Sequence, residues 1–275
     1  MGPVRETVSA TKGARMKKLK ERLRRGDTLV GCFLNLGSAL TAEMAGRAGF
    51  DCVVIDLEHG AGGEADVLPQ LQALEATGAA AIVRVESHER QRAHRVLDLG
   101  AEGIMFPRVG SAAEASKAVA GLRYPPEGVR GVAIANRACG FGVSHREYMA
   151  AAGETILGLV QIESEESVAD ADAIAAVDGA DLLFVGPMDL SQSLGIFGQF
   201  DHPRFTEALE ATASAARRHG KALGVLMAKV EEFERYHSLG FRLIACGSDG
   251  SMLNTAARRQ VEMLTTARSR CLAGS

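Results

Sequence analysis

Acidic, basic and histidine side chains follow the short apolar runs of this sequence at the points where the runs end. The run over residues 52–56 ends in Asp56 and is followed by His59, and the run that begins near residue 80 ends in Arg84. A turn after Asp56 would direct its carboxylate at the His59 imidazole and raise its basicity. These residues predict a general base and a guanidinium that, next to a metal, would stabilise an oxyanion or bind a carboxylate. The alternative for Arg84 is that it pairs with a structural carboxylate.

Two further carboxylates follow later apolar runs. Glu163 ends the segment Gln161-Ile-Glu163, and Asp189 ends the segment Gly186-Pro-Met-Asp189. On adjacent strands, these two carboxylates would supply oxygen ligands to one hard divalent cation. The alternative is that Asp189 caps the helix starting near Leu190 and that Glu163 is simply solvated. The residues alone leave both interpretations open.

A repeated pattern of helix, glycine and apolar run must position these side chains. Gly49, Gly100, Gly179 and Gly240 each follow a helical pattern and precede an apolar run. The chain contains eight such runs, beginning near residues 29, 52, 80, 102, 157, 181, 222 and 243. Runs without strict alternation are typical of parallel strands buried on both faces. The pattern predicts an α/β fold, a (β/α)8 TIM barrel with its chemistry at the C-terminal ends of the strands.

A doubly wound open sheet is the alternative fold, because the segment Gly60-Ala-Gly62-Gly63 weakly resembles a dinucleotide-binding loop. The segment lacks the required glycine spacing and does not follow the first strand, so the barrel is favoured. Two connections are long, at about 55 residues between the fourth and fifth strands and about 41 between the sixth and seventh. Inserts of this length indicate functional loops or contacts between subunits.

The composition is typical of a globular protein. The chain has 275 residues, of which 47% are hydrophobic and 24% are charged, which excludes disorder, collagen and coiled coil. It has no apolar window of about 18 residues and no secretory signal, so we expect a cytoplasmic protein without a membrane partner. Its five cysteines include no close pair, which argues against a disulfide framework and against a zinc site.

Positive charge is concentrated at the N-terminus. Residues 1–26 contain nine Lys or Arg and two acidic residues, whereas the whole chain has a net charge of -3. The remainder is therefore acidic, which argues against a nucleic-acid partner. We predict a flexible basic tail over residues 1–13 and a solvated helix over 14–25, within a single barrel domain over 14–275. A nucleic-acid arm or a targeting segment is the alternative for the basic start.

Six motifs occur in order along residues 17–265 and together resemble those of a known family. They are Val54-Ile-Asp56-Leu-Glu58-His59-Gly60, the strand ending in Arg84, Leu97-Asp98-Leu-Gly100 with Ile104-Met-Phe-Pro107, Arg123-Tyr-Pro-Pro-Glu-Gly-Val-Arg130-Gly131, Gln161-Ile-Glu163 and Gly186-Pro-Met-Asp189-Leu-Ser191. In these motifs the chain resembles the class II, metal-dependent pyruvate aldolases of the 4-hydroxy-2-oxoheptanedioate and 2-keto-3-deoxy sugar acid aldolase family.

This resemblance implies a barrel of the phosphoenolpyruvate/pyruvate type that assembles as a homo-hexamer, a trimer of dimers, with the last helix exchanged between neighbours. It also implies that Glu163 and Asp189 bind Mg²⁺, Mn²⁺ or Co²⁺, which chelates the carboxylate and keto oxygens of a small 2-oxo acid. Gln161 would lie beside the metal. The substrate-binding residues implied by the resemblance are Arg84, Gln161, Gly186, Pro187 and Met188.

The resemblance also implies a catalytic mechanism. The metal and Arg84 would stabilise the pyruvate enolate that forms as the C3–C4 bond of a 4-hydroxy-2-oxo acid breaks, and His59 with its partner Asp56 would remove the C4 hydroxyl proton. The reaction would be reversible and would give pyruvate and an aldehyde. Asp98 matches an acid that helps to complete the site of a neighbouring subunit. The aldehyde stays open, because Met188 stands where family members often have a smaller residue.

Three other functions are compatible with the residues. A class I aldolase would form a Schiff base, and Lys229, after the seventh strand, is the lysine near the predicted rim. An oxaloacetate decarboxylase, or another enzyme that acts through a pyruvate enolate, would use the same metal site. A non-catalytic barrel serving as a scaffold or sensor is a third alternative.

Overall fold

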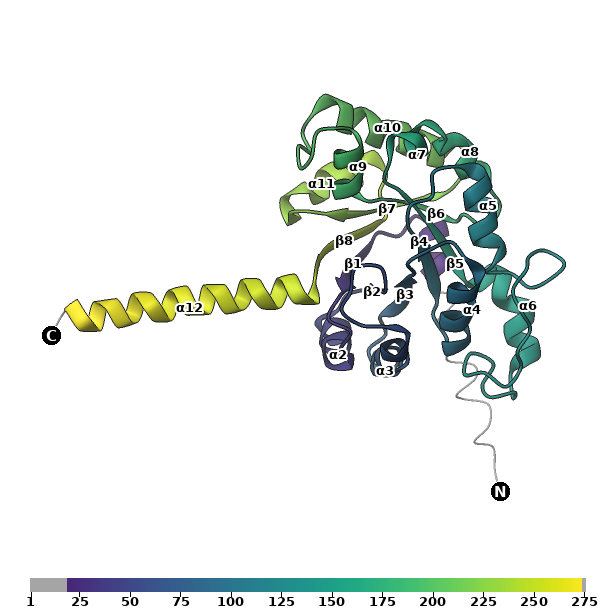
Figure 1. The fold of residues 1–275 in the computed structure, drawn as a ribbon, viewed down its shortest axis with the longest axis horizontal. Coiled ribbons are helices and arrows are strands. Elements are labelled where there is room, and N and C mark those ends of the chain that lie inside the picture. The colour runs from purple at the N-terminus through teal and green to yellow at the C-terminus, as the bar shows by residue number, and fades with distance from the viewer. Residues whose placement is uncertain (1–18, 274–275) are drawn as a thin grey trace, which may run out of the picture.

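The computed structural model describes residues 19–273, and in this range eight parallel strands form a closed barrel (Figure 1). The strands follow one another around the barrel in sequence order, and the first strand pairs with both the second and the eighth. This closure confirms the predicted barrel and excludes an open sheet. The strands are β1 Leu29–Leu34, β2 Cys52–Asp56, β3 Ala80–Arg84, β4 Gly103–Phe106, β5 Leu157–Ile162, β6 Leu182–Val185, β7 Ala222–Met227 and β8 Leu243–Ser248.

Helices surround the barrel and connect successive strands. Gly49, Gly100 and Gly240 end three of these helices in the left-handed conformation, as the sequence predicts. The helices are α2 Ala39–Ala48, α3 Glu64–Leu74, α4 Arg90–Leu99, α5 Ala112–Ala120, α6 His145–Thr155, α7 Glu165–Ala169, α8 Ala171–Ala176, α9 Pro187–Ser193, α10 Pro203–Arg218, the short 3-10 helix η1 Val230–Glu232, α11 Phe233–Leu239 and α12 Asp249–Ala273.

The strands carry two apolar cores, one on each face. In β2, Cys52 and Val54 belong to the cluster inside the barrel, whereas Val53 and Ile55 belong to the layer between the barrel and the helices. Burial on both faces explains why the strand runs are continuously apolar. Charged side chains enter only at the ends of the strands, where Asp56 and Arg84 are paired in register across β2 and β3.

The helix that precedes β1 closes the N-terminal end of the barrel. Residues 19–24 are helical, as predicted, but Leu19 and Leu23 are buried in the barrel-interior cluster. The prediction of a solvated helix was therefore wrong, because these leucines lie one turn apart and form an apolar face among the basic residues. The predicted tail over 1–13 and residues 14–18 of the predicted helix lie outside the described residues.

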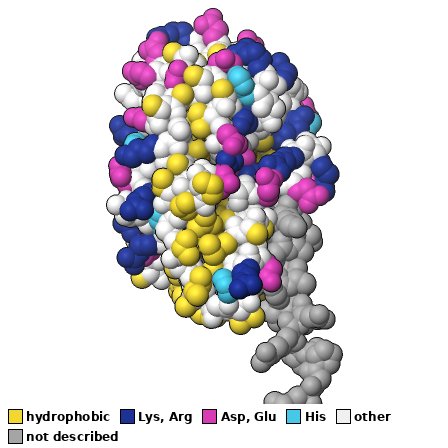
Figure 2. All heavy atoms as spheres, turned by 90° about the vertical axis from the view of Figure 1, so that its right-hand side faces the viewer, with side chains coloured by type: hydrophobic (Ala, Val, Ile, Leu, Met, Phe, Trp, Pro, Cys, Tyr) yellow, Lys and Arg dark blue, Asp and Glu magenta, His cyan; other side chains and the backbone are white. Residues whose placement is uncertain are grey.

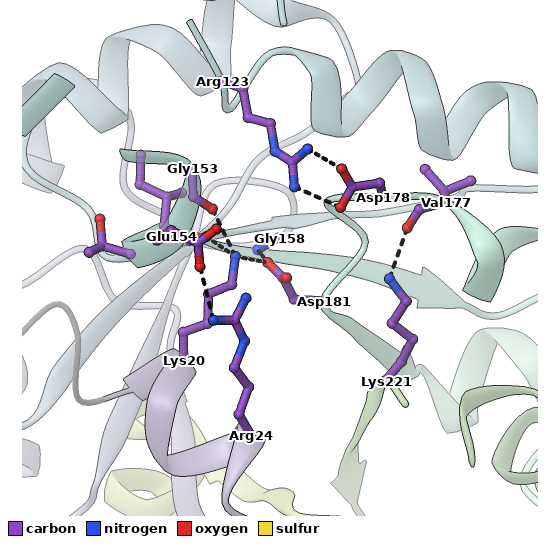
Figure 3. Close-up of polar contacts among 12 residues, drawn as sticks. Lys20, Arg24, Arg123, Gly153, Glu154, Gly158, Val177, Asp178, Asp181 and Lys221 are labelled. Carbon is purple, nitrogen blue, oxygen red and sulfur yellow. Dashed lines mark hydrogen bonds and ion pairs between the residues drawn. The ribbon is translucent and has the colours of Figure 1, made fainter. Parts of the chain in front are cut away.

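Lys20 on this helix is a buried cation that joins the helix to the segments just before β5 and β6 (Figure 3). Its ammonium group lies 2.9 Å from Asp181, which precedes β6, and donates to the carbonyl oxygens of Gly153 and Ile156 at 3.1 and 3.3 Å. The Asp181 carboxylate also accepts a hydrogen bond from the backbone N–H of Gly158 at 2.9 Å. The contacts of Lys20 thus seal the barrel on the side opposite the C-terminal strand ends.

Replacing Lys20 with Met should destabilise the fold by about 3 kcal/mol, because Asp181 and two carbonyl groups lose their partner in a buried position. Arg24→Met on the same helix is the matched control, since the Arg24–Glu154 pair is exposed and should be worth less than about 0.5 kcal/mol. Urea unfolding at one protein concentration measures both changes. Equal losses in the two variants would contradict this role of Lys20.

The two long connections extend the barrel in different ways. The first contains α5, α6 and a loop, and its Arg130 lies fully buried between the rings of Tyr124 and Tyr148, at 4.7 and 5.3 Å from the ring centres. Arg130 also donates to Asp98 on α4 at 2.8 Å, which fastens the insert to the helix layer around the barrel. The second connection contains α9 and α10.

Helix α12 extends away from the barrel (Figure 1). The helix has 25 residues, and those from Ser251 onwards are exposed. The exposed side chains include the apolar Leu253, Val261 and Leu264. Within residues 19–273, no helix combines the length and the apolar character needed to cross a membrane.

Candidate active site

The C-terminal ends of the strands surround a cavity of about 410 Å³. Its walls contain most of the residues that the sequence predicts for the site. Glu163 does not itself line the cavity but accepts a hydrogen bond from Gln161, which does, whereas Asp98 lies on α4 away from the wall. The predicted residues in the wall are Asp56, His59, Arg84, Gln161, Gly186, Pro187, Met188 and Asp189.

Arg84 is held by two carboxylates at one side of the cavity. Its Nε and one terminal nitrogen donate to the two oxygens of Asp56 at 2.9 and 2.7 Å, and its other terminal nitrogen lies 2.9 Å from Glu58. Desolvation alone would lower the pKa of Arg84, but the contacts with Asp56 and Glu58 outweigh it and raise this pKa. Arg84 is therefore a fixed positive charge with a fixed direction.

Asp56 contacts Arg84 and not the His59 imidazole, which corrects the expected carboxylate–histidine pair. The Asp56 carboxylate also accepts hydrogen bonds from the backbone N–H groups of Glu58 and His59 at 3.1 and 3.3 Å. The imidazole Nε2 lies 3.9 Å from Glu58, and the His59 side chain is 67% exposed. A buried carboxylate is compensated better by a permanent guanidinium charge than by an exposed imidazole, which explains why Asp56 pairs with Arg84. Asp56 contacts the His59 loop only through the backbone N–H groups of that loop.

Phe33, at the end of β1, supports the guanidinium from inside the barrel. The central carbon of Arg84 lies 5.1 Å from the centre of the Phe33 ring, and Phe184 lies behind that ring with 6.1 Å between ring centres. A cation over an aromatic face is stabilised by the ring quadrupole. The two rings therefore help to fix Arg84 and form an apolar wall of the cavity.

Glu163 is buried at the end of β5 and is held on both oxygens. One oxygen accepts a hydrogen bond from the backbone N–H of Arg108 at 2.6 Å, and the other accepts from the Gln161 amide at 2.9 Å. A Cβ atom on Gly186 would lie 2.7 Å from the second oxygen, so a larger residue at this position would displace the Glu163 carboxylate. The structure thus reserves a defined place for the Glu163 carboxylate beside the cavity.

The charge environment of Glu163 suits a cation. The pKa of Glu163 is raised to about 7, mainly by burial and in smaller part by the negative charges of Asp189 and Glu58. Asp189 is exposed in the first turn of α9, where Gly186 is the N-cap residue, so Asp189 does not cap this helix. A divalent cation between Glu163 and Asp189 would remove the repulsion between these carboxylates.

Two carboxylates would leave most of the coordination positions to other ligands. Among residues 19–273, no group of three or more His, Cys, Asp or Glu side chains has a metal-binding arrangement. A hard cation usually takes six or more oxygen ligands, so water and substrate oxygens would complete the shell. The donor set therefore fits a metal that binds together with a chelating substrate.

Several residues of the cavity wall were not predicted. Asn35 directly follows β1 and Ser248 ends β8, so their position at the end of an apolar run was an available signal. Phe200 comes from the second long connection, and no local pattern marks it. Lys229 is exposed, precedes η1 and is not part of the wall, which removes the structural support for a Schiff-base lysine at this position.

The family model of the HpcH/HpaI aldolase/citrate lyase matches residues 29–256, which include the whole barrel. The chain belongs to this family. The family, the barrel and an enzyme of the aldolase type, all predicted from the sequence, are therefore confirmed.

Individual members of the family that are similar to this chain include named aldolases and a solved structure. The 5-keto-4-deoxy-D-glucarate aldolase of Shigella boydii serotype 18 is 38% identical over 242 residues, which cover 88% of this chain and 94% of the relative. The enzyme of the same name from Salmonella paratyphi C is 40% identical over 232 residues, with 84% and 90% covered. The crystal structure of an HpcH/HpaI aldolase/citrate lyase family protein from Burkholderia cenocepacia has a TM-score of 0.86 and 37% identity, covering 90% of this chain and 99% of that one.

Proposed function

We propose that this protein is a metal-dependent aldolase that cleaves a 4-hydroxy-2-oxo sugar acid reversibly to pyruvate and an aldehyde. The observation that carries this proposal is that Arg84, fixed by Asp56, lines the cavity together with Asp189 and Gln161, and that Gln161 holds the buried Glu163 carboxylate next to this wall. A guanidinium and a cation-binding carboxylate together suit an enolate. The names of the relatives support 5-keto-4-deoxy-D-glucarate as the first substrate to test.

Glu163 and Asp189 would hold the divalent cation, for which Mg²⁺, Mn²⁺ and Co²⁺ are the candidates. When bound, the cation would supply Lewis-acid stabilisation of negative charge on the substrate. Both carboxylates are hard oxygen donors, which favours these ions over softer metals. Gln161 donates to Glu163 and lies near Arg84, so it would keep the carboxylate aligned.

The residues of the chain would act on the substrate as follows. Arg84 would donate a hydrogen bond to the keto oxygen, where negative charge develops as the C3–C4 bond breaks. His59 lines the cavity and would accept the proton of the C4 hydroxyl, which releases the aldehyde. Protonation of the enolate at C3 then gives pyruvate. Gly186, Pro187 and Met188 form the adjoining wall and would position the substrate.

We also propose that the protein assembles as a homo-hexamer, a trimer of dimers, in which α12 packs on a neighbouring copy and Asp98 approaches a neighbour's site. The apolar side chains of α12 are exposed within one chain, and a helix in water depends on packing for most of its stability. Figure 2 shows a second apolar patch, on the side of the molecule where the insert between α5 and α6 lies. Exposed side chains of this insert are Val129, Val132, Ile134, Phe141 and Val143.

Pyruvate release tests the proposed reaction. The wild-type protein should release pyruvate from 5-keto-4-deoxy-D-glucarate, lose this activity after EDTA treatment and regain it with Mg²⁺ or Mn²⁺. Lactate dehydrogenase coupling measures the product, and oxaloacetate serves as the comparison substrate. Activity that resists EDTA would contradict the metal site, and faster release of carbon dioxide from oxaloacetate would favour the decarboxylase.

Metal binding should depend on pH because the cation competes with a proton at Glu163. Its folded pKa of about 7 lies above the ordinary 4.5, so the metal-free protein should lose stability as the pH rises from about 4.5 to about 7. Above that range Glu163 is deprotonated and ready for the cation. Thermal unfolding should therefore show a larger rise in Tm with Mn²⁺ at about pH 8 than at about pH 5.5. An equal rise at both pH values would contradict this role of Glu163.

A further inference from the structure

The first turn of α12 is tied to the loop after β1 by a buried carboxylate. One oxygen of Asp249 accepts a hydrogen bond from the backbone N–H of Asn35 at 2.8 Å, and the other accepts from the Thr41 hydroxyl at 2.6 Å. The side chain of Asn35 accepts in turn from the backbone N–H of Gly250 at 3.3 Å. Three hydrogen bonds therefore join residues that are more than 200 positions apart in the chain.

The same loop after β1 is joined to the loop that carries His59. The carbonyl oxygen of Asn35 accepts a hydrogen bond from the backbone N–H of Ala61 at 2.7 Å. Gly37 and Gly62 approach so closely that a Cβ atom on Gly37 would lie 2.6 Å from the Cα atom of Gly62. Backbones in such contact cannot shift independently. The position of the loop after β1 therefore determines the position of the loop that carries His59.

From these contacts we infer that Asp249 is a positioning residue for the His59 loop, residues 57–63, and acts on it through Asn35. The inference rests on the proposed function, in which His59 accepts the substrate proton. Asn35 and His59 both line the cavity, whereas Asp249 does not. The start of α12 thus has a role within its own chain, separate from the packing of the rest of this helix on a neighbour.

The geometry around Asp249 predicts which substitutions preserve this link. Alanine removes both side-chain acceptors. Asparagine keeps the contacts, because its amide oxygen accepts from Asn35 and its amide nitrogen donates to the Thr41 hydroxyl. That hydroxyl lies 3.1 Å from the carbonyl oxygen of Ser38 and donates there instead. The link depends on hydrogen bonds rather than on negative charge.

Hydrogen exchange of the Ala61 amide in the full-length protein tests the inference. Ala61 contacts neither Asp249 nor α12 through a hydrogen bond, so it reports transmission through Asn35. In Asp249→Ala, this amide should exchange about tenfold faster while the β6 amides stay unchanged, and kcat should fall with little change in KM. Asp249→Asn should keep the Ala61 exchange rate and kcat close to those of the wild type. The milder Thr41→Val should increase the Ala61 exchange rate by only about threefold.

A variant in the exposed part of α12 distinguishes the effect of the Asp249–Asn35 contact from the effect of oligomer assembly. Leu264→Glu alters an exposed part of α12 far from Asp249 and should reduce oligomer mass in sedimentation while Ala61 stays protected. The inference is overturned if Asp249→Ala leaves Ala61 exchange unchanged, or if Leu264→Glu accelerates it equally. Exchange does not require turnover. If the wild-type protein had no aldolase activity, the proposed function would be refuted, but the exchange experiment would still show whether Asp249 positions the His59 loop.

Discussion

Glu163→Gln should lower kcat by about a thousandfold, which corresponds to about 4 kcal/mol of transition-state stabilisation, and should abolish the response to added Mn²⁺. The glutamine has the same size, and its amide oxygen still accepts the backbone hydrogen bond from Arg108. Its amide nitrogen replaces the oxygen that accepts from Gln161, so the Gln161 amide must turn over to accept in its place. The glutamine lacks the charge that a cation requires. Steady-state pyruvate release and Mn²⁺ titration measure both effects.

The stability of this variant provides an internal check. Burial already disfavours the charged form of Glu163, so the metal-free variant should be at least as stable as the wild type at about pH 8. Glu165→Gln is the matched control, because Glu165 lies two residues away and its 3.1 Å ion pair with Arg204 is exposed to solvent. A Glu163→Gln variant with near wild-type kcat and an unchanged Mn²⁺ response would refute the proposed metal site.

Arg84→Lys should lower kcat by about a hundredfold to a thousandfold, although the positive charge is kept. A lysine ammonium cannot reproduce the two parallel hydrogen bonds to Asp56 together with the contact to Glu58. The remaining charge would move away from the position of the keto oxygen. Pyruvate release at saturating substrate measures kcat, and KM should change less because, in the proposed site, the carboxylate end of the substrate would also bind the cation.

The role of Arg84 in stability is tested with a second variant, and an exposed arginine provides the control for activity. Arg84→Met leaves Asp56 buried without its partner and should cost about 3 to 5 kcal/mol in the free energy of unfolding. Arg92→Lys also removes a guanidinium that bridges two carboxylates, but Arg92 is more exposed and lies outside the cavity. It should leave kcat unchanged. Equal activity of the Arg84→Lys and wild-type proteins would contradict the proposed role of Arg84.

The strands and the side chains at their ends were predictable from the sequence. The observed strands begin within one residue of the predicted positions, at residues 29, 52, 80, 103, 157, 182, 222 and 243. Burial on both faces demands an unbroken apolar run, and the first polar residue after each run marks the rim. Arg84, Gln161 and Asp189 could therefore be placed at one mouth without any knowledge of distances.

The partners of these side chains were not predictable in the same way. Local spacing suggested that Asp56 contacts His59, three residues away, but the register of β2 and β3 places Arg84 closer to its carboxylate. The basic N-terminal segment looked solvated from its charge alone. Only the barrel supplies Asp181 and the carbonyl groups that compensate Lys20 in a buried position.

The sequence by itself determined the barrel, the order of its strands and the residue types at its mouth, because hydrophobic periodicity is a local property that tertiary contacts do not alter. Only the tertiary structure decided which charges neutralise each other and that Asp249 joins the loop after β1 from the far end of the chain. The physical reason is that a buried polar group is stable only beside a partner, and the nearest partner depends on packing between distant segments.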